Sequence, residues 1–211
     1  MPNREGRIIT VGVTGASGAL LAQAALRILE DDARVTRVHL VVSDAGQRLF
    51  ATELEVTSGD LKQLPQRVLG RPSTKIETLP NHDVGASIAS GSYPVDAMIV
   101  IPCSMGTLAS IANGTSEDLI ARAADVMLKE CRKLVLCIRD TPFSRIHLEN
   151  MLRAQQAGAL IMPAIPSFYH QPKTIDDLAT QYVCRVLAQI GLPQERMYRW
   201  PGQSASKAKQ A

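Results

Sequence analysis

The sequence lacks a strong charge of either sign, a cysteine pairing motif and a long apolar run. Its 23 basic and 20 acidic residues leave a net charge of +3 over 211 residues. This balance gives no reason to expect a nucleic-acid partner or a membrane surface. No run is apolar for long enough to cross a bilayer, and the short apolar run near the amino terminus is typical of a strand rather than a signal peptide.

Metal-binding and disulfide patterns are also missing. The four cysteines form no C-x-x-C motif, and the four histidines lack the spacing of metal ligands. These absences argue against disulfides and zinc, so we expect no metal and a reducing, cytoplasmic location. The residues concerned are Cys103, Cys131, Cys137, Cys184, His39, His82, His147 and His170.

Strand-like and helix-like runs alternate along the chain. Runs rich in Ile and Val predict strands at residues 7–13, 35–43, 96–104, 133–138 and 159–166. Periodic apolar residues and capping signals predict helices at residues 17–29, 44–54, 83–91, 105–114, 116–130, 144–158 and 174–191, the fifth of them capped by Ser116. Residues 58–82 are interrupted by three prolines and give no clear prediction.

This alternation predicts a doubly wound parallel sheet, an α/β fold of three α/β/α layers that is Rossmann-like or flavodoxin-like. We expect one domain over residues 1–200 and a polar tail over residues 201–211. Ligands of such sheets bind beyond the carboxyl ends of the strands. Polar residues follow three predicted strands, at residues 14–18, at Ser43 and at residues 103–107, so we expect the site there.

The glycine-rich segment GVTGASG, residues 12–18, joins the first predicted strand to the first predicted helix. It lacks the G-x-G turn of the dinucleotide fingerprint, and no clear acidic residue ends the second strand, so an NAD-dependent dehydrogenase is disfavoured. Two interpretations remain. The glycines either serve tight packing, or they form a loop in which the amides of Ala16, Ser17 and Gly18 face a phosphate. In the second case the Ser17 hydroxyl is also a candidate to accept or donate a proton.

Two further pairs of residues have both an ordinary and a functional interpretation. Ser104 and Thr107 start a helix after a strand, where a hydroxyl serves as a cap or as a ligand contact. Arg122 and Lys129 lie seven residues apart and share one helix face. That face is either a solvated basic surface or a pair of cations aimed at a phosphate.

Four more candidates lie late in the chain. Arg139 and Asp140 follow a strand, either as a surface ion pair or as part of a site at its carboxyl end. Tyr169 lies in a loop, where packing is the ordinary role, and Arg185 lies within a helix, where a surface position is the ordinary role.

Several segments together resemble one family. They are GVTGASGA, VVSDAG, ASIASGS, IPCSMGTLASIANG, DLIARAADVMLKE, LVLCIRDTPFSRIHLENM and SFYHQPKTIDDL, in this order. The ordered set is similar to the UbiX-type flavin prenyltransferases from about Arg7 to Trp200. Its most specific part runs from IPCSMG to MLKE.

The resemblance implies a flavodoxin-like or Rossmann-like fold that binds FMN. It implies transfer of a dimethylallyl group from dimethylallyl phosphate to reduced FMN, with bonds at N5 and C6 of the flavin. The product, prenylated FMN, would serve a UbiD-type decarboxylase, often in ubiquinone synthesis. Family members are metal-independent and typically form homododecamers, and the choice between monophosphate and diphosphate substrates stays open.

The resemblance also implies roles for matching positions. Ser17, Lys129 and Asp140 are the catalytic candidates, and Asp140 replaces a glutamate that is common in the family, which puts its reach in question. Trp200 is either a cover over the prenyl group or a packing residue. The implied FMN contacts are Gly15, Ala16, Ser17, Ser43, Ser104, Met105, Gly106, Thr107 and Arg139. The implied ligands of dimethylallyl phosphate are Arg122, Lys129, Tyr169 and Arg185. For Arg122 and Lys129 the resemblance leaves open whether they reach the site of a neighbouring subunit.

Two alternative functions share the expected cofactor. One is an FMN-dependent cysteine decarboxylase, which uses a histidine in the first helical region, whereas this chain has no histidine before residue 39. The other is a non-catalytic FMN-binding partner of a decarboxylase. The set of Arg122, Lys129, Tyr169 and Arg185 favours an enzyme with a second, phosphate-bearing ligand.

Overall fold

A parallel six-stranded sheet organises the described part of the chain, residues 5–57 and 59–200 of the computed structural model. The strand order is β3-β2-β1-β4-β5-β6, which is the order of a Rossmann-type doubly wound fold. The predicted three-layer α/β fold is therefore confirmed. The strands are β1 (Arg7–Val13), β2 (Val35–Val42), β3 (Ile76–Pro80), β4 (Ala97–Cys103), β5 (Lys133–Ile138) and β6 (Leu160–Ile161).

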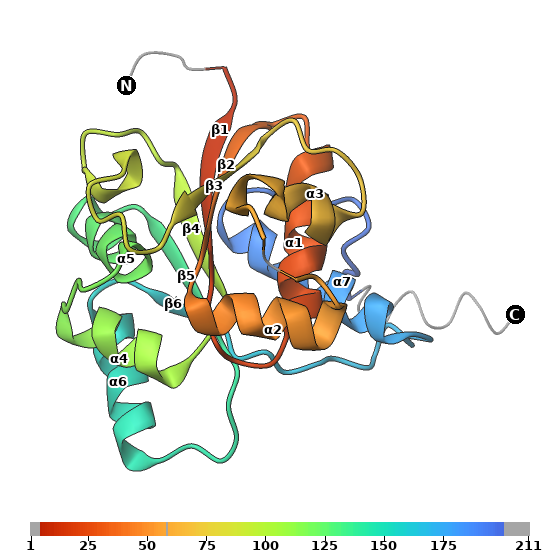
Figure 1. Cartoon of the computed structure of the whole chain (residues 1–211). Helices are drawn as coiled ribbons and strands as arrows, with labels where there is room; N and C mark the ends of the chain where they lie inside the picture. The colour runs from red at the N-terminus through yellow and green to blue at the C-terminus, as the bar shows by residue number, and fades with distance from the viewer. Residues whose placement is uncertain (1–4, 58, 201–211) are drawn as a thin grey trace, which may run out of the picture.

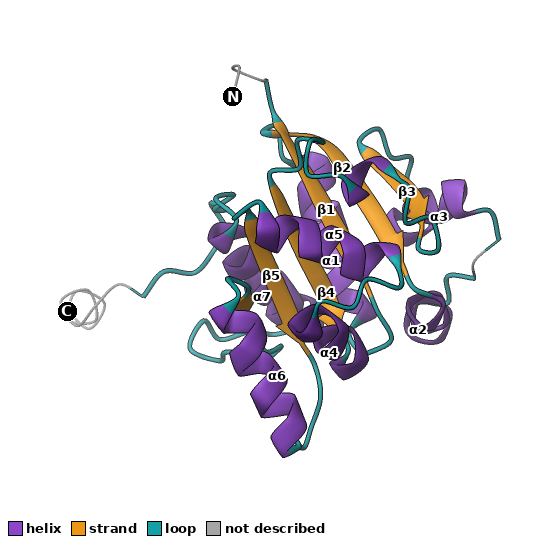
Figure 2. Ribbon diagram, turned by 90° about the vertical axis from the view of Figure 1, so that its left-hand side faces the viewer, coloured by secondary structure: helices purple, strands orange, loops and turns teal. Residues whose placement is uncertain are grey.

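Helices cover both faces of this sheet (Figure 1). One face carries α1 (Ala19–Asp31), α2 (Asp44–Leu54), α3 (Leu64–Leu69) and α7 (Ile175–Gln189). The other carries α4 (Met105–Asn113), α5 (Leu119–Lys129) and α6 (Arg145–Gln156). The turned view in Figure 2 shows α4, α5 and α6 in front of the strands. Two short 3-10 turns, at Leu61–Gln63 and Ser87–Ala89, complete the described elements.

The strands are apolar on both faces because each face is covered by helices. Val11 and Leu40 belong to the core under α1 and α7, whereas Val41 and Val100 belong to the core under α4 and α5. All four side chains are fully buried. A continuous apolar run, rather than an alternating one, is what a strand buried on both sides requires.

The helices and strands of the structure differ from those predicted from the sequence in four places. Strand β3 lies within the proline-rich stretch that gave no prediction, at the edge of the sheet, where proline is tolerated. The helix expected over residues 83–91 is only the 3-10 turn at Ser87–Ala89. The last strand covers two residues instead of eight. Helix α5 begins after Asp118, whose carboxylate accepts the Ala121 amide at 2.8 Å, so Ser116 is not its cap.

Gly46 permits a close contact that fixes α2 against β1. A Cβ at Gly46 would lie 2.6 Å from the backbone oxygen of Val13, which cannot move without disturbing the sheet. We expect Gly46→Ala to lower the free energy of unfolding by about 1–3 kcal/mol, the usual cost of overpacking. Chemical denaturation of the two proteins measures this difference.

Gly106 offers the matched control in the first turn of α4. A Cβ there would meet no atom within 4 Å. Gly106→Ala should change the free energy of unfolding by less than about 1 kcal/mol, in the stabilising direction, because alanine favours helix. An equal loss of unfolding free energy in the two variants would show that the contact of Gly46 with Val13 O does not explain the effect.

Candidate active site at the carboxyl edge of the sheet

Hydrogen bonds tie four loops together beyond the carboxyl ends of β2, β1, β4 and β5. The Ser43 amide donates to Val13 O at 3.0 Å, which joins the ends of β2 and β1. At the next junction the Thr14 hydroxyl donates to Pro102 O at 2.9 Å and accepts from the Ser104 amide at 2.8 Å. The Arg139 amide reaches Cys103 O at 3.4 Å. The loops therefore follow the strand order as one continuous edge.

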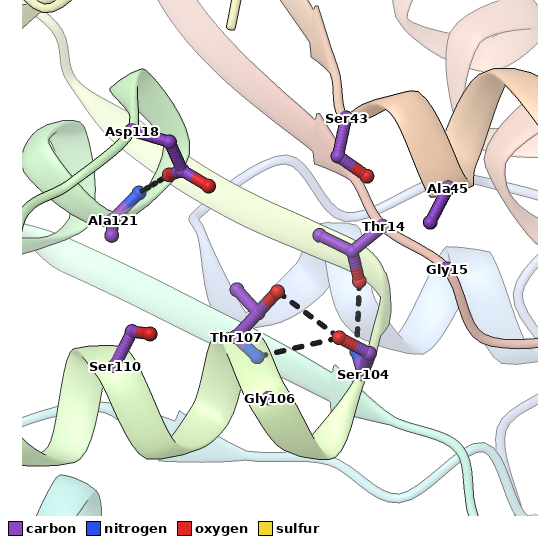
Figure 3. A pocket seen from close by; sticks show the side chains of 10 residues that line it. All are labelled: Thr14, Gly15, Ser43, Ala45, Ser104, Gly106, Thr107, Ser110, Asp118 and Ala121. Atoms are coloured by element: carbon purple, nitrogen blue, oxygen red, sulfur yellow. Dashed lines mark hydrogen bonds between the residues drawn. The ribbon is translucent and has the colours of Figure 1, made fainter. Parts of the chain in front are cut away.

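A cleft of about 310 Å³ opens at this edge, centred on the junction of β1 and β4. The winding of the sheet reverses between these strands, and ligands of doubly wound folds bind at such a point. Hydroxyl groups dominate the polar lining (Figure 3). The lining residues are Thr14, Gly15, Ser43, Ala45, Ser104, Gly106, Thr107, Ser110, Asp118 and Ala121.

Helix amino termini point their positive ends at the cleft. Ser43 caps α2 through the Gly46 amide at 3.1 Å, and Ser104 caps α4 through the Thr107 amide at 3.3 Å. The remaining amides of a first turn have no acceptor within their own helix, so they favour an anion. Five of the predicted FMN contacts line this cleft, namely Gly15, Ser43, Ser104, Gly106 and Thr107.

Gly15 holds the glycine-rich loop against α2. A Cβ at Gly15 would clash with the Ala45 Cβ, which supports the packing interpretation of this glycine. Two of the three amides that the phosphate interpretation invokes are paired within the chain. The Ala16 amide donates to Thr14 O at 2.9 Å, and the Gly18 amide donates to Glu53 Oε2 at 3.0 Å.

Glu53 is a site residue that the sequence did not reveal. Its carboxylate accepts the Ala19 amide at 2.8 Å as well as the Gly18 amide, and it is also hydrogen-bonded to the Ser17 side chain. Glu53 lies 36 positions after Ser17, in the last turn of α2, which runs across the carboxyl edge below α1 (Figure 1). Only this tertiary crossing brings the two residues together, so no local pattern could have indicated it.

The environment of Glu53 favours its ionised form. Burial alone would raise the pKa of this carboxyl, but the hydrogen bonds from Ser17, Ala19 and Gly18 lower it below its ordinary value, aided by the positive field of Arg139. Arg139 in turn has a buried Nε that meets no hydrogen-bond partner within the described residues. An orphaned buried donor of this kind calls for an acceptor on a ligand.

Arg122 and Lys129 lie on α5 and hold different partners. Arg122 pairs with Asp125 at 3.0 Å, and Lys129 Nζ pairs with Glu130 Oε1 at 2.7 Å. Helix α5 starts at the cleft and ends at Lys129, about 15 Å further along its axis at 1.5 Å per residue. Lys129 therefore lies near the amino-end edge of the sheet, where a Cβ on Gly91 would come within 2.8 Å of its Nζ.

Tyr169 and Arg185 lie on the other side of the sheet from α5, the helix that carries Arg122 and Lys129. Arg185 is exposed on α7, which packs against α1, and Tyr169 is half-exposed in the loop between β6 and α7. The Tyr169 ring lies 5.2 Å from that of Tyr198 and 6.1 Å from that of Trp200. The sheet thus separates Lys129 from Arg185, so these two cannot bind the same phosphate within one chain.

Comparison with known proteins identifies the family. A family model described as Flavoprotein matches residues 2–184. The flavin prenyltransferase UbiX of Alkalihalophilus pseudofirmus is 44% identical over 95% of this chain and 99% of its own. A crystal structure of AnUbiX (PadA1) in complex with FMN and dimethylallyl pyrophosphate is similar with a TM-score of 0.83, at 40% identity over 93% of this chain and 98% of that one.

The chain belongs to the UbiX-type flavin prenyltransferases. A further similar structure is a dodecameric FMN-dependent UbiX-like decarboxylase from Escherichia coli O157:H7. Its TM-score is 0.82, at 41% identity over 92% of this chain and 100% of that one.

The residues of this UbiX-type chain fit FMN at the carboxyl edge. The orphaned Arg139 Nε, the hydroxyls of Ser43 and Ser104 and the helix amino termini supply the donors that a phosphorylated flavin needs. Asp140 follows Arg139 and accepts the Thr141 amide at 2.8 Å. Over residues 5–57 and 59–200, no three His, Cys, Asp or Glu side chains gather to hold a metal, and no helix there has the length and apolarity to span a membrane.

Glu53 should contribute to stability above its ordinary pKa of 4.5, because its folded pKa lies lower. That contribution is lost as the pH falls through the folded value. We expect Glu53→Gln to lower the free energy of unfolding at pH 7 by about 0.5–1 kcal/mol, a modest effect because water screens this exposed carboxylate. Denaturation at pH 7 and pH 3 measures it, and the difference between the two proteins should shrink at pH 3.

The neighbouring Glu55→Gln is the matched control, because Glu55 is also exposed but lies beyond the end of α2. An equal loss in this variant at pH 7 would show that the Glu53 effect is one of net charge alone.

Proposed function

We propose that the protein joins the dimethylallyl group of dimethylallyl phosphate to N5 and C6 of reduced FMN and releases prenylated FMN. The observation that carries this assignment is the continuous edge formed by Ser43, Thr14, Ser104 and Arg139, where the unpaired Arg139 Nε and the amino termini of α2 and α4 match a phosphorylated flavin. The AnUbiX relative, crystallised with FMN and dimethylallyl pyrophosphate, supports a flavin and a dimethylallyl phosphate ester as the two ligands here. The proposal keeps Gly15, Ala16, Ser17, Met105, Gly106 and Thr107 as further flavin contacts.

The phosphate-binding residues of one site come from different copies of the chain. Lys129 and Arg185 lie on opposite sides of one sheet, so a site that uses both needs a neighbouring subunit. Arg122 and Tyr169 complete the set as a cation and a hydroxyl donor. The dodecameric state of the Escherichia coli relative supports an assembly of this kind.

Helix α6 offers an apolar surface for that assembly. Ile146, Leu148 and Leu152 are exposed by 67%, 53% and 57%, and Phe143 just before the helix and Leu160 just after it are also exposed. A cluster of large exposed apolar side chains marks an interaction surface rather than a solvated face. We assign it to contacts between copies, with a homododecamer as the expected state.

The chain's own residues act mainly by stabilising the negative charge that develops on the leaving phosphate. When bound, reduced FMN supplies an electron-rich ring as the nucleophile. Breaking the allylic C–O bond leaves its electron pair on the phosphate, and Lys129, Arg122 and Arg185 stabilise that developing charge, with Tyr169 donating a hydrogen bond. No metal is needed for this step, because four donors surround the leaving group. Positioning of the allyl carbon against the flavin supplies much of the remaining rate.

Ring closure at C6 releases a proton, and Ser17 and Glu53 form a path for it. The Ser17 hydroxyl is hydrogen-bonded to the Glu53 carboxylate, which is ionised at neutral pH. Ser17 is therefore able to pass a proton to Glu53, or to the released phosphate, as it receives one from the flavin edge. Asp140, at the same edge of the sheet, is a further carboxylate within the proposed site.

The product is a modified flavin that another enzyme must use. We propose a UbiD-type decarboxylase as its recipient, in ubiquinone synthesis, and the cytoplasm as the location. The cysteine content and the absence of C-x-x-C motifs support that location.

Mass spectrometry of the flavin tests the proposed reaction. The full-length protein is incubated without oxygen with reduced FMN and either dimethylallyl phosphate or the diphosphate. We expect the flavin to gain one dimethylallyl unit with the monophosphate. An unchanged flavin mass with both donors would overturn the assignment. In a separate incubation with oxidised FMN and a cysteine-ended peptide, release of carbon dioxide with reduction of the flavin would support the alternative decarboxylase.

Ser17→Ala and Glu53→Gln test the proton path in the same assay. Both variants should still bind FMN, but they should accumulate the prenylated product at least tenfold more slowly, since general acid–base groups contribute about 100-fold or more. Full rates in both variants would remove this pair from the chemistry.

A further inference from the structure

The end of the described chain returns to the loop that carries Tyr169. After α7 the chain turns back along this helix, and Tyr198 and Trp200 pack their rings against Tyr169. The Tyr169 and Tyr198 rings are tilted by 44° at a centroid distance of 5.2 Å, whereas Trp200 meets Tyr169 edge-on at 83°. The position of the Tyr169 ring thus depends on residues about thirty positions later in the sequence.

Gln181 holds this returning segment with both ends of its side-chain amide. Its Nε2 donates to Arg196 O at 2.9 Å, and its Oε1 accepts from the Tyr198 amide at 2.8 Å. The carbonyl and the amide lie two residues apart, on either side of Met197, where the chain turns and the Met197 amide donates to Gln194 O at 3.1 Å. Binding both groups needs a donor and an acceptor on one side chain, and the primary amide of Gln181 supplies them.

The two hydrogen bonds from Gln181 to residues 196–198, called the clamp below, lie next to the proposed substrate ligands. Gln181 and Arg185 are four residues apart on α7, so they occupy neighbouring positions on one helix face. Gln181 and Tyr198 also line a cleft of about 550 Å³ together with His170, the residue after Tyr169. The segment that Gln181 binds thus connects the Arg185 face of α7 with the Tyr169 loop.

We propose that Gln181 is a positioning residue for the prenyl phosphate site, acting on Tyr169 through Tyr198. It contacts no substrate itself. By fixing residues 196–198, it places the Tyr198 ring against Tyr169 and so sets the direction of the Tyr169 hydroxyl. This inference deepens the proposed function and rests on it for the role of Tyr169, whereas the clamp itself is a property of the fold.

A purely structural role for Gln181 makes a different prediction. If the clamp only stabilised the chain, its loss would lower the melting temperature and affect both ligands alike. If it positions Tyr169, its loss should weaken use of the prenyl phosphate and leave FMN binding unchanged, because the flavin contacts lie at the carboxyl edge around Ser104.

The test compares Gln181→Ala and Gln181→Glu in the full-length protein. The alanine variant loses both hydrogen bonds. The glutamate variant keeps an acceptor for the Tyr198 amide but sets a second oxygen against Arg196 O. We expect the KM for dimethylallyl phosphate to rise roughly tenfold in both, as the loss of one or two hydrogen bonds implies, with the Kd for FMN within about twofold. Gln189→Ala, at an exposed position on the same helix, should match the wild type.

Trp200 gives a readout that does not depend on catalysis. It is the single tryptophan of the chain, so its fluorescence reports on the clamped segment. Acrylamide should quench it more strongly in both Gln181 variants than in Gln189→Ala. Thermal unfolding and chromatographic size of each variant show whether it remains folded and assembled.

A double-mutant comparison tests the route through Tyr198. Tyr198→Leu should raise the KM for dimethylallyl phosphate, and adding Gln181→Ala to it should cause little further change, because residues in one chain of contacts are not additive. If the two substitutions instead raised the KM by the product of their separate effects, Gln181 would not act through Tyr198.

The quenching and kinetic results together separate the remaining outcomes. An unchanged KM in folded variants with increased quenching would overturn the positioning role of Gln181. Unchanged quenching would overturn the proposal that Gln181 holds residues 196–198 in place. A wild type that never prenylates FMN would remove the proposed function and this substrate role, while the quenching result would still decide the clamp.

Discussion

Thr14 joins the two central strands at the point where the winding of the sheet reverses, and the site depends on this junction. Its hydroxyl donates to Pro102 O and accepts from the Ser104 amide, so one side chain sets the spacing between the first loop and the start of α4. The hydroxyl is buried and fully paired, which makes its geometry costly to change. Ser43 and Arg139 extend the same edge on either side. A flavin site at this edge is therefore a direct product of strand order.

The same architecture places the proposed phosphate ligands on opposite sides of the sheet. Helices on opposite faces of a sheet present their outer residues in opposite directions, and Lys129 and Arg185 lie on two such helices. A phosphate that needs both must lie between copies. The exposed apolar residues of α6 provide a reason for copies to associate, and in the proposed assembly association would bring the second half of the ligand set to the flavin edge.

Local patterns predict the buried strands well because a strand covered on both faces needs a continuous apolar run, as in β1 and β4. They fail for β3, an edge strand that ends in proline, and for the start of α5, where Ser116 and Asp118 are both plausible caps. Resemblance to a family assigns residues such as Arg139 that spacing alone leaves ambiguous. Neither approach finds Glu53 or Gln181, because their partners are distant in sequence and meet them only after α2 crosses the sheet edge and the chain returns along α7.

We propose that different copies of the chain supply Lys129 and Arg185 to one site, and mixed assemblies test this most directly. Lys129→Ala and Arg185→Ala chains, each carrying a different tag, are co-expressed, and the mixed assemblies are purified through both tags. Formation of prenylated FMN is then measured for the mixture and for each variant alone. We expect the mixed assemblies to regain activity well above either variant, since some sites receive both intact residues from different copies. Mixed assemblies as inactive as the separate variants, beside an active wild-type assembly purified in the same way, would contradict it.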